Sequence, residues 1–335
     1  MNELEEKPAD DGGASKFGSR LMIGVVFGLV VYIAYVLWAD VGKIKEALTG
    51  FPWELLLVAC GLSFTNYAIR FLRWQRYLKL LDIRVTAGTS FNIYLAGLAL
   101  TVTPGKMGET FKSWLLKRID GTPIAKSAPI IVAERFTDLL GFLILIAISG
   151  IATQPDYAWV FWATLALCAA LLVLAASRKV ERLLIVILEK LPAVNRFAPK
   201  LEGAFESTRI LLAPRELFFP TVISAAGWSL ECLGFWLIAN ALTDTDISFL
   251  TTTYAYALSA VAGAVLIIFP GGLGVTEASM GALLTRAYQT GEVSLEVASA
   301  KAASATILIR ACTLWFAVGV GLIATYIFNR NRRAI

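Results

Sequence analysis

Long apolar runs separated by short polar segments form the main pattern along this chain. A helix needs about 20 apolar residues to cross the hydrocarbon layer of a membrane, and eight runs approach or exceed that length. They cover residues 20–39, 52–69, 88–103, 127–150, 157–177, 216–241, 250–269 and 302–328. The pattern predicts an all-α polytopic membrane protein, with a single membrane domain at 20–330 behind a disordered, cytoplasmic, acidic tail at 1–19.

Two of the runs, 88–103 and 250–269, end in similar Pro-Gly motifs, each of which continues with a further glycine and a glutamate. Proline removes a backbone donor and clashes with the preceding helical turn. Backbone groups freed in this way at membrane depth are tolerated only against protein or a water-filled cavity. The motifs therefore predict two interrupted segments beside a binding site, with breaks at Pro104, Gly105, Gly108, Pro270, Gly271, Gly272 and Gly274.

The charges of the loops predict an orientation for each run. Lys and Arg are concentrated at 70–84, 112–126 and 330–333, whereas the connections 151–156 and 242–249 carry Asp and neither Lys nor Arg. Because Lys and Arg favour the cytoplasmic side of short loops, the first three segments are expected inside and the last two outside. Both termini are then cytoplasmic.

This orientation cannot be met if all eight runs cross the membrane. It predicts instead six full transmembrane helices and two oppositely oriented re-entrant helical hairpins, at 88–118 and 250–290. Such an inverted repeat is typical of transporters whose site lies near the bilayer midplane. The mixed-charge, amphipathic segment 178–215 is expected to lie along the cytoplasmic surface. The alternative is that both motifs belong to ordinary loops that contain Pro-Gly.

Composition excludes several kinds of chemistry. Hydrophobic residues make up 57% of the 335 residues and charged residues 16%, and the mean hydropathy is +0.69. The chain has no histidine, and its four cysteines lie singly in apolar runs. A His-based triad, a metal centre and a disulfide framework are therefore not expected, and we expect no cofactor. Nucleic-acid binding is also not expected, because the basic residues are spread over membrane-flanking loops.

Several ionisable residues lie inside or beside the apolar runs, where each costs at least about 2.5 kcal/mol unless it has a partner. Lys and Arg beside broken-helix backbone suit an anionic head group, and the carboxylates could carry protons or balance the cations. Internal ion pairs, such as Arg310 with Glu231 or Glu277, are the alternative. The candidate site residues are Arg70, Arg73, Lys106, Glu109, Lys112, Glu134, Arg135, Asp138, Glu277 and Arg310, and none is assigned as catalytic.

The segment from Arg70 to Tyr77 allows two interpretations. Its basic residues could gather anionic lipid at the cytoplasmic boundary, at about 1 kcal/mol per basic residue. The favoured interpretation is that positive charge anchors the segment at the cytoplasmic side, together with an aromatic belt of Trp74 and Tyr77. Glu109 and Glu277, one after each break, are expected to face one polar cavity from opposite leaflets.

Four motifs follow in order along the chain: RFLRW from Arg70, PGKMGE from Pro104, ERFTDLLG from Glu134 and PGGLGVTE from Pro270. Together they resemble the flippase-like membrane domain of lysylphosphatidylglycerol synthetases and its stand-alone UPF0104 relatives. The resemblance covers nearly the whole chain after residue 20. It implies a protein of the bacterial cytoplasmic (inner) membrane that moves or handles an anionic or modified phospholipid, or another envelope lipid.

The resemblance does not extend to the soluble aminoacyl-transferase domain of the synthetases, so lysylphosphatidylglycerol synthesis is not expected. A lipid flippase or scramblase-like transporter is the leading hypothesis. The alternatives are a membrane-embedded head-group transferase with a carboxylate base, and a non-transporting lipid-binding partner of a biosynthetic enzyme. Membrane lipids are the expected partners, and the hypotheses leave open a homo-oligomer or a complex with a lipid-biosynthesis enzyme.

Overall fold

The structure is a computed structural model that describes residues 41–102, 107–150, 158–190, 198–244, 246–265, 272–289 and 293–333, with positions 26, 28–30, 32, 33 and 37. The described elements are all helices, as the apolar pattern predicts. The tail at 1–19 and most of the first predicted run lie outside the described residues. So do Thr103 to Lys106 and Leu266 to Gly271, which include the two Pro-Gly pairs.

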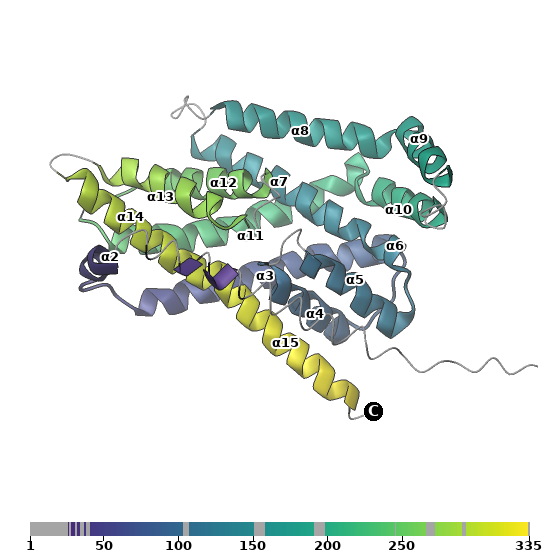
Figure 1. The fold of residues 1–335 in the computed structure, drawn as a ribbon, viewed down its shortest axis with the longest axis horizontal. Helices are drawn as coiled ribbons and strands as arrows, with labels where there is room; N and C mark the ends of the chain where they lie inside the picture. The colour runs from purple at the N-terminus through teal and green to yellow at the C-terminus, as the bar shows by residue number, and fades with distance from the viewer. Residues whose placement is uncertain are drawn as a thin grey trace, which may run out of the picture.

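Four described helices are long and apolar enough to cross a membrane. They are α3 (Glu54–Leu80), α8 (Ala158–Ala176), α11 (Pro214–Ala241) and the continuous helix of α14 (Leu295–Arg310), η6 (Ala311–Trp315) and α15 (Phe316–Arg333). Each covers most or all of a predicted run, although α3 continues well beyond residue 69. Most of them run along the long axis of the molecule (Figure 1). The chain is thus a membrane protein with several transmembrane-length helices.

The predicted run at 127–150 forms α7 (Pro129–Ser149), whose 21 residues also suffice to span a membrane. Its apolar sequence is interrupted by Glu134, Arg135 and Asp138 near its start. Both carboxylates are almost completely buried in the protein. Helix α7 is therefore a long apolar helix whose charges are satisfied by other helices, and those contacts define the site described below.

Two pairs of shorter helices flank the predicted breaks. Helix α4 (Ala87–Ala96), continued by the 3-10 turn η1 (Gly97–Leu100), precedes the first break, and α5 (Met107–Asp120) follows it. Helix α12 (Phe249–Val265) precedes the second break, and α13 (Val275–Tyr288) follows it. The first pair lies toward the end of the molecule where α3 ends, and the second pair lies toward the opposite end (Figure 1).

Four further helices lie near the ends of the long ones: α2 (Val41–Ala47), α6 (Ile124–Ser127), α9 (Arg178–Glu189) and α10 (Ala198–Leu211). Helices α9 and α10 form the predicted amphipathic segment and are joined by an ion pair between Arg209 and Glu181. Leu183 and Ile187 on α9 are exposed, although the helix begins with charged residues. This apolar exposure agrees with a helix lying on a membrane surface.

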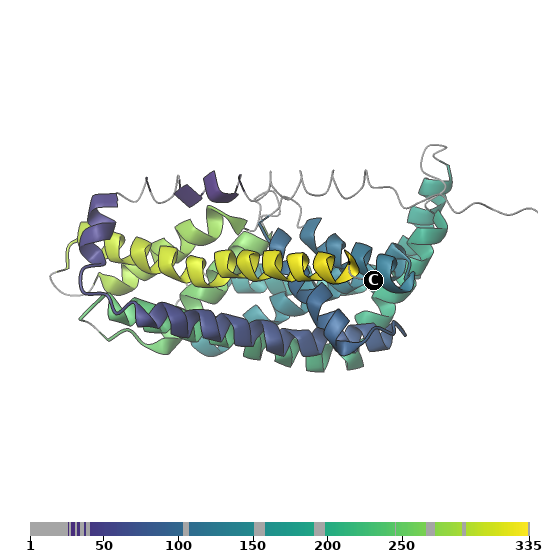
Figure 2. The same cartoon turned by 90° about the horizontal axis from the view of Figure 1, so that it is seen from below.

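The long helix at the C-terminus changes its winding in the middle. Residues Ala311–Trp315 form a π-helical segment between α14 and α15, and the helix runs through it as one rod (Figure 2). A π segment leaves backbone carbonyls without their usual helical donor. The Tyr67 hydroxyl donates to one of them, the carbonyl of Thr313, at 2.8 Å. The interruption is thereby stabilised from α3.

Helix α15 also contacts the first helix pair at very short range. A Cβ atom at Gly321 would lie 2.0 Å from the backbone nitrogen of Ala99 in η1. Only glycine allows the two backbones to approach so closely. Gly321 therefore allows η1 to pack directly against α15.

The buried apolar side chains form two large clusters. One is built around α11, α12, α13 and α14, and the other around α3, α4, α5 and α7. Helix α7 contributes to both, with Phe136 in the second and Phe142 in the first, and Asp138 lies between them. The charged residues of α7 are consequently placed where the two halves of the molecule meet.

Candidate functional site

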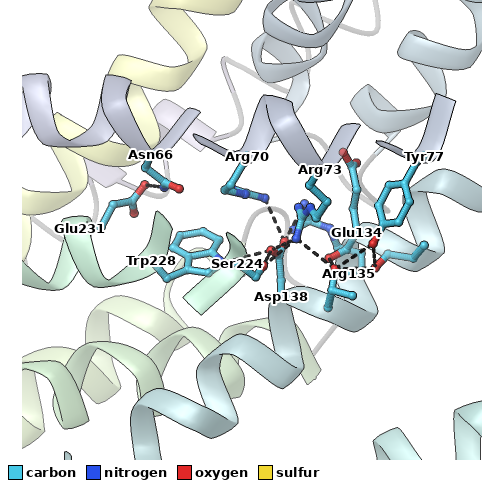
Figure 3. A network of polar contacts seen from close by, with 12 residues as sticks. Asn66, Arg70, Arg73, Tyr77, Glu134, Arg135, Asp138, Ser224, Trp228 and Glu231 are labelled. Atoms are coloured by element: carbon cyan, nitrogen blue, oxygen red, sulfur yellow. Dashed lines mark hydrogen bonds and ion pairs between the residues drawn. The ribbon is translucent and has the colours of Figure 1, made fainter. Parts of the chain in front are cut away.

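A carboxylate on α7 lies at the centre of the charged residues. The Oδ1 atom of Asp138 accepts from Arg73 Nη1 at 2.7 Å, and its Oδ2 atom accepts from Arg70 Nη2 at 2.9 Å. Arg135 lies 3.2 Å from the same Oδ2 atom. Ser224 and Trp228 of α11 also donate to Oδ1, at 2.6 and 3.1 Å. Figure 3 shows these groups converging on Asp138 from three helices.

The burial of this cluster shows whether Arg70 and Arg73 lie at the surface or in the interior of the protein. Arg73 has no solvent exposure, and Arg70 and Asp138 are also buried. The interpretation of Arg70 and Arg73 as surface anchors is therefore wrong, because α3 continues past residue 69 and turns both side chains inward. The predicted aromatic belt is wrong for the same reason, since Trp74 and Tyr77 are buried beside them.

A second ion pair joins α5 to α7. Lys112 Nζ lies 2.5 Å from Glu134 Oε2 and 4.6 Å from the centre of the Trp74 ring, a cation–π arrangement. A Cβ atom at Gly97 would lie 2.6 Å from the Lys112 side chain, so glycine in η1 leaves room for the lysine stem. Glu134 Oε1 accepts no hydrogen bond from any described residue.

A third ion pair lies beside the second break. Arg310 Nε donates to Glu277 Oε1 at 2.5 Å, and Glu277 Oε2 accepts the Gly274 backbone N–H at 2.7 Å. Gly272 and Gly274 have φ angles of +72° and +86°, which L-residues rarely adopt. Both glycines thus form an irregular turn before α13, at the place where the sequence predicts a break. This turn holds Glu277 toward the long helix.

Glu231 on α11 has a different environment from the other carboxylates. Its Oε1 atom accepts from Asn66 Nδ2 at 2.5 Å, and its Oε2 atom accepts from the Tyr256 hydroxyl. It is buried, yet it forms no ion pair with any described Lys or Arg. The sequence predicts Glu231 only as an alternative partner for Arg310, and Arg310 pairs with Glu277 instead. The sequence feature that could identify Glu231 as a site residue is its position as an acidic residue inside a long apolar helix.

These groups surround one cavity of about 170 Å³ in the interior of the protein. Helices on both sides of each break line it, including η1, α5, α12 and α13. The lining combines aromatic rings with charged groups. Its ionisable members, apart from tyrosines, are Arg70, Lys112, Glu134, Arg135, Glu231 and Arg310.

The carboxylates and cations are not distributed evenly around this cavity. Among the described residues, four basic side chains line it, against the two carboxylates of Glu134 and Glu231. Asp138 and Glu277, which hold Arg70 and Arg310, are not among the lining residues. The surface of the cavity is therefore more positive than the surrounding polar network, which suits a ligand with negative charge.

The predicted site residues thus fall into four groups. Arg70, Lys112, Glu134, Arg135 and Arg310 line the cavity, whereas Arg73, Asp138 and Glu277 pair with charged or polar neighbours behind it. Gly108 lies in the first turn of α5, and Gly272 and Gly274 adopt left-handed conformations before α13. The remaining residues lie outside the described residues or have undescribed side chains: Pro104, Gly105, Lys106, Glu109, Pro270 and Gly271.

Across the part of the chain that the structure describes, no group of three His, Cys, Asp or Glu side chains could hold a metal ion. The fold and this cavity define a polytopic α-helical membrane protein with a charged, protein-lined chamber. The family model described as "Lysylphosphatidylglycerol synthase TM region" matches residues 25–321. The chain belongs to this family, as the four motifs suggest, and the family takes its name from an enzyme of membrane lipid metabolism.

A similar protein is the UPF0104 membrane protein PH1989 of Pyrococcus horikoshii. It is 23% identical to this chain over 328 residues, which cover 89% of this chain and 94% of the relative. The similarity therefore extends over most of the chain, including both predicted breaks.

Proposed function

We propose that this protein is a lipid transporter, a flippase or scramblase-like protein that moves an anionic or modified lipid across the cytoplasmic membrane. The observation that carries the proposal is the cationic lining of the cavity by Arg70, Lys112, Arg135 and Arg310. Charged side chains at membrane depth are costly and mark pathways for polar substrates. Membership in a family named after a lipid synthase supports a lipid as that substrate.

The chemistry of the lining favours a phosphate-bearing head group. Arginine and lysine are the side chains that bind phosphate oxygens most effectively. Arg70 also lies over the Trp228 ring, 4.7 Å from its centre, so it is held at the cavity wall as well as at Asp138. The head group would pass through the cavity while the acyl chains stay in the bilayer. None of this requires covalent chemistry.

The arrangement of the helices supports an inverted topology for the transporter. We propose six full spans and two re-entrant hairpins, α4–α5 and α12–α13, which enter from opposite sides, with both termini cytoplasmic. The two hairpins lie toward opposite ends of the long helices in Figure 1. The gap between α3 and α4 and that between α5 and α6 are both short, which suits a hairpin that returns to its starting side.

Cysteine labelling in intact cells tests this topology. In a background in which the four native cysteines are replaced by alanine, Arg84→Cys and Lys117→Cys should resist a membrane-impermeant maleimide, and Asp246→Cys should react. All three positions are exposed in the structure, so access to the reagent depends on the side of the membrane. Reaction of Lys117→Cys together with protection of Arg84→Cys would make the first hairpin a full span.

Reconstitution into liposomes tests transport. The purified protein should move fluorescent phosphatidylglycerol between leaflets, detected by dithionite quenching. Arg70→Gln should reduce the rate roughly tenfold, equivalent to about 1.4 kcal/mol, because it removes a cation from the cavity wall. Arg76→Gln, on the same helix, is the matched control, since Arg76 pairs with Glu216 and does not line the cavity.

Three outcomes separate the proposed function from its alternatives. Equal rates in protein-containing and protein-free liposomes would contradict transport. Conversion of the lipid by the detergent-purified protein would favour the head-group transferase. Binding of the lipid without movement or conversion would favour a partner of a biosynthetic enzyme.

A further inference from the structure

Among the cavity-lining residues that the structure describes, Glu231 is the carboxyl group that forms no ion pair with a described Lys or Arg. Glu134, the other carboxylate of the lining, pairs with Lys112. Glu231 lies between α3 and α12 and contacts two neutral groups, Asn66 and Tyr256 (Figure 3 shows Asn66 and Glu231). Since an unbalanced carboxylate inside a membrane is costly, a protein that retains one requires a reason for it.

The two neighbours can satisfy Glu231 in either charge state. When the carboxyl is ionised, the Asn66 amide and the Tyr256 hydroxyl both donate to it. When it is protonated, the Tyr256 oxygen can accept its proton, because a tyrosine hydroxyl both donates and accepts. A carboxyl group surrounded by Lys or Arg lacks this second option, because those side chains donate hydrogen bonds and never accept them.

Asn66 adds a second acceptor for the protonated form. The Asn66 side chain is completely buried, and its Oδ1 atom has no donor among the described residues. It lies against Gly227, where a Cβ atom would approach it to 2.4 Å. Rotation of the amide by half a turn keeps its shape and would present Oδ1 to Glu231 in place of the donor. Asn66 Oδ1, which has no donor among the described residues, could then accept a hydrogen bond from protonated Glu231.

We propose that Glu231 is a proton-binding site of the cavity, and that proton binding there and anionic head-group binding favour each other. The second half of this proposal rests on the proposed transport function. A proton from the aqueous phase would bind one carboxylate oxygen and return to that phase on release, so no other bond changes. Because protonation removes one of the two negative charges of the lining, it increases the excess of positive charge that faces a phosphate.

Several other titratable or charged groups lie near Glu231 and would contribute to a pH dependence of the cavity. They are Tyr67 and Arg70 on α3, Cys232 on α11 itself, Glu134, Arg135 and Asp138 on α7, Tyr256 on α12, and Arg310 on α14. Arg70 and Arg310 keep their charge over the physiological range, and both are held by other carboxylates. The Glu231 carboxyl is therefore the group of this set most free to exchange a proton with the cavity.

Infrared difference spectroscopy tests the proton site without any need for transport. With the full chain in lipid nanodiscs, a protonated-carboxyl C=O band should appear on acidification and disappear as the pH is raised. The band should be absent in Glu231→Gln and present in the control Glu54→Gln, which changes an exposed residue. Persistence of the band in Glu231→Gln would overturn the proposal. If Glu231→Gln fails to fold, Tyr256→Phe should shift the titration midpoint, and an unchanged midpoint would overturn the proposal as well.

A transport readout tests the coupling. Movement of fluorescent phosphatidylglycerol should increase toward acidic pH, by at most about tenfold per pH unit for one proton. Glu231→Gln should abolish this slope, and Glu54→Gln should keep it. A slope that survives in Glu231→Gln would overturn the coupling. If wild-type protein moves no lipid but the band titrates, the proton site stands and the proposed transport function fails.

Discussion

Replacement of Asp138 with alanine should prevent the protein from accumulating in a folded form. The substitution leaves Arg70, Arg73 and Arg135 without the carboxylate that they share, and two of these arginines are buried. Loss of one partner from a buried ion pair costs about 3–5 kcal/mol, which is comparable to the stability of many domains. Size-exclusion chromatography of detergent extracts should show aggregated protein, with little material at the position of the wild type.

Two variants make this prediction specific. Asp246→Ala removes an exposed carboxylate and should leave the elution profile and melting temperature unchanged. Addition of Arg73→Met to Asp138→Asn should recover part of the folded yield, because the most deeply buried unbalanced cation is then removed. Wild-type melting of Asp138→Ala would show that the cluster does not hold the helices together.

The second large effect is expected at Gly321, where Gly321→Ala should destabilise the protein by about 1–3 kcal/mol. The new methyl group would lie 2.0 Å from the backbone nitrogen of Ala99, so α15 must move away from η1. This cost opposes the usual gain of about 1 kcal/mol when alanine replaces glycine inside a helix. Thermal unfolding in detergent measures the difference.

Gly319 provides the matched control on the same helix. Apart from the backbone of its own helix, no atom of the described residues lies within 4 Å of a Cβ placed at Gly319, so Gly319→Ala should be neutral or stabilising. The two substitutions have the same chemistry and differ only in the neighbouring backbone. Equal melting temperatures for both variants would mean that η1 and α15 are not closely packed.

The sequence predicts the helical class well because helix length and apolar composition are local properties. The runs at 157–177 and 216–241 match α8 and α11 to within a few residues. The end of α3 is predicted less well. Its basic residues resemble a cytoplasmic loop, and nothing local shows that Arg70 and Arg73 face a carboxylate 65 or more positions away in the chain.

In the site as well, contacts within one helix can be predicted from the sequence, whereas contacts between helices cannot. The candidate list includes Arg135 and Asp138, whose i,i+3 spacing on one helix already predicts contact. The sequence does not show which acidic residue of another helix pairs with a given arginine. It therefore leaves Glu231 and Glu277 as alternatives for Arg310. The environment of Glu231 depends on Asn66 and Tyr256, which are neutral residues with no pattern of their own. Such partners become visible only when three helices are placed side by side.

The π-helical segment at Ala311–Trp315 affects how one long helix contacts both helix pairs, α4–α5 and α12–α13. A π segment turns less per residue than an α-helix, so α15 is rotated about its axis by roughly a quarter of a turn relative to an uninterrupted continuation of α14. Arg310 before the segment faces α13, and Gly321 after it faces η1. The π segment therefore sets the angle about the helix axis between the contact with α13 and the contact with η1, so one long helix orients both helix pairs.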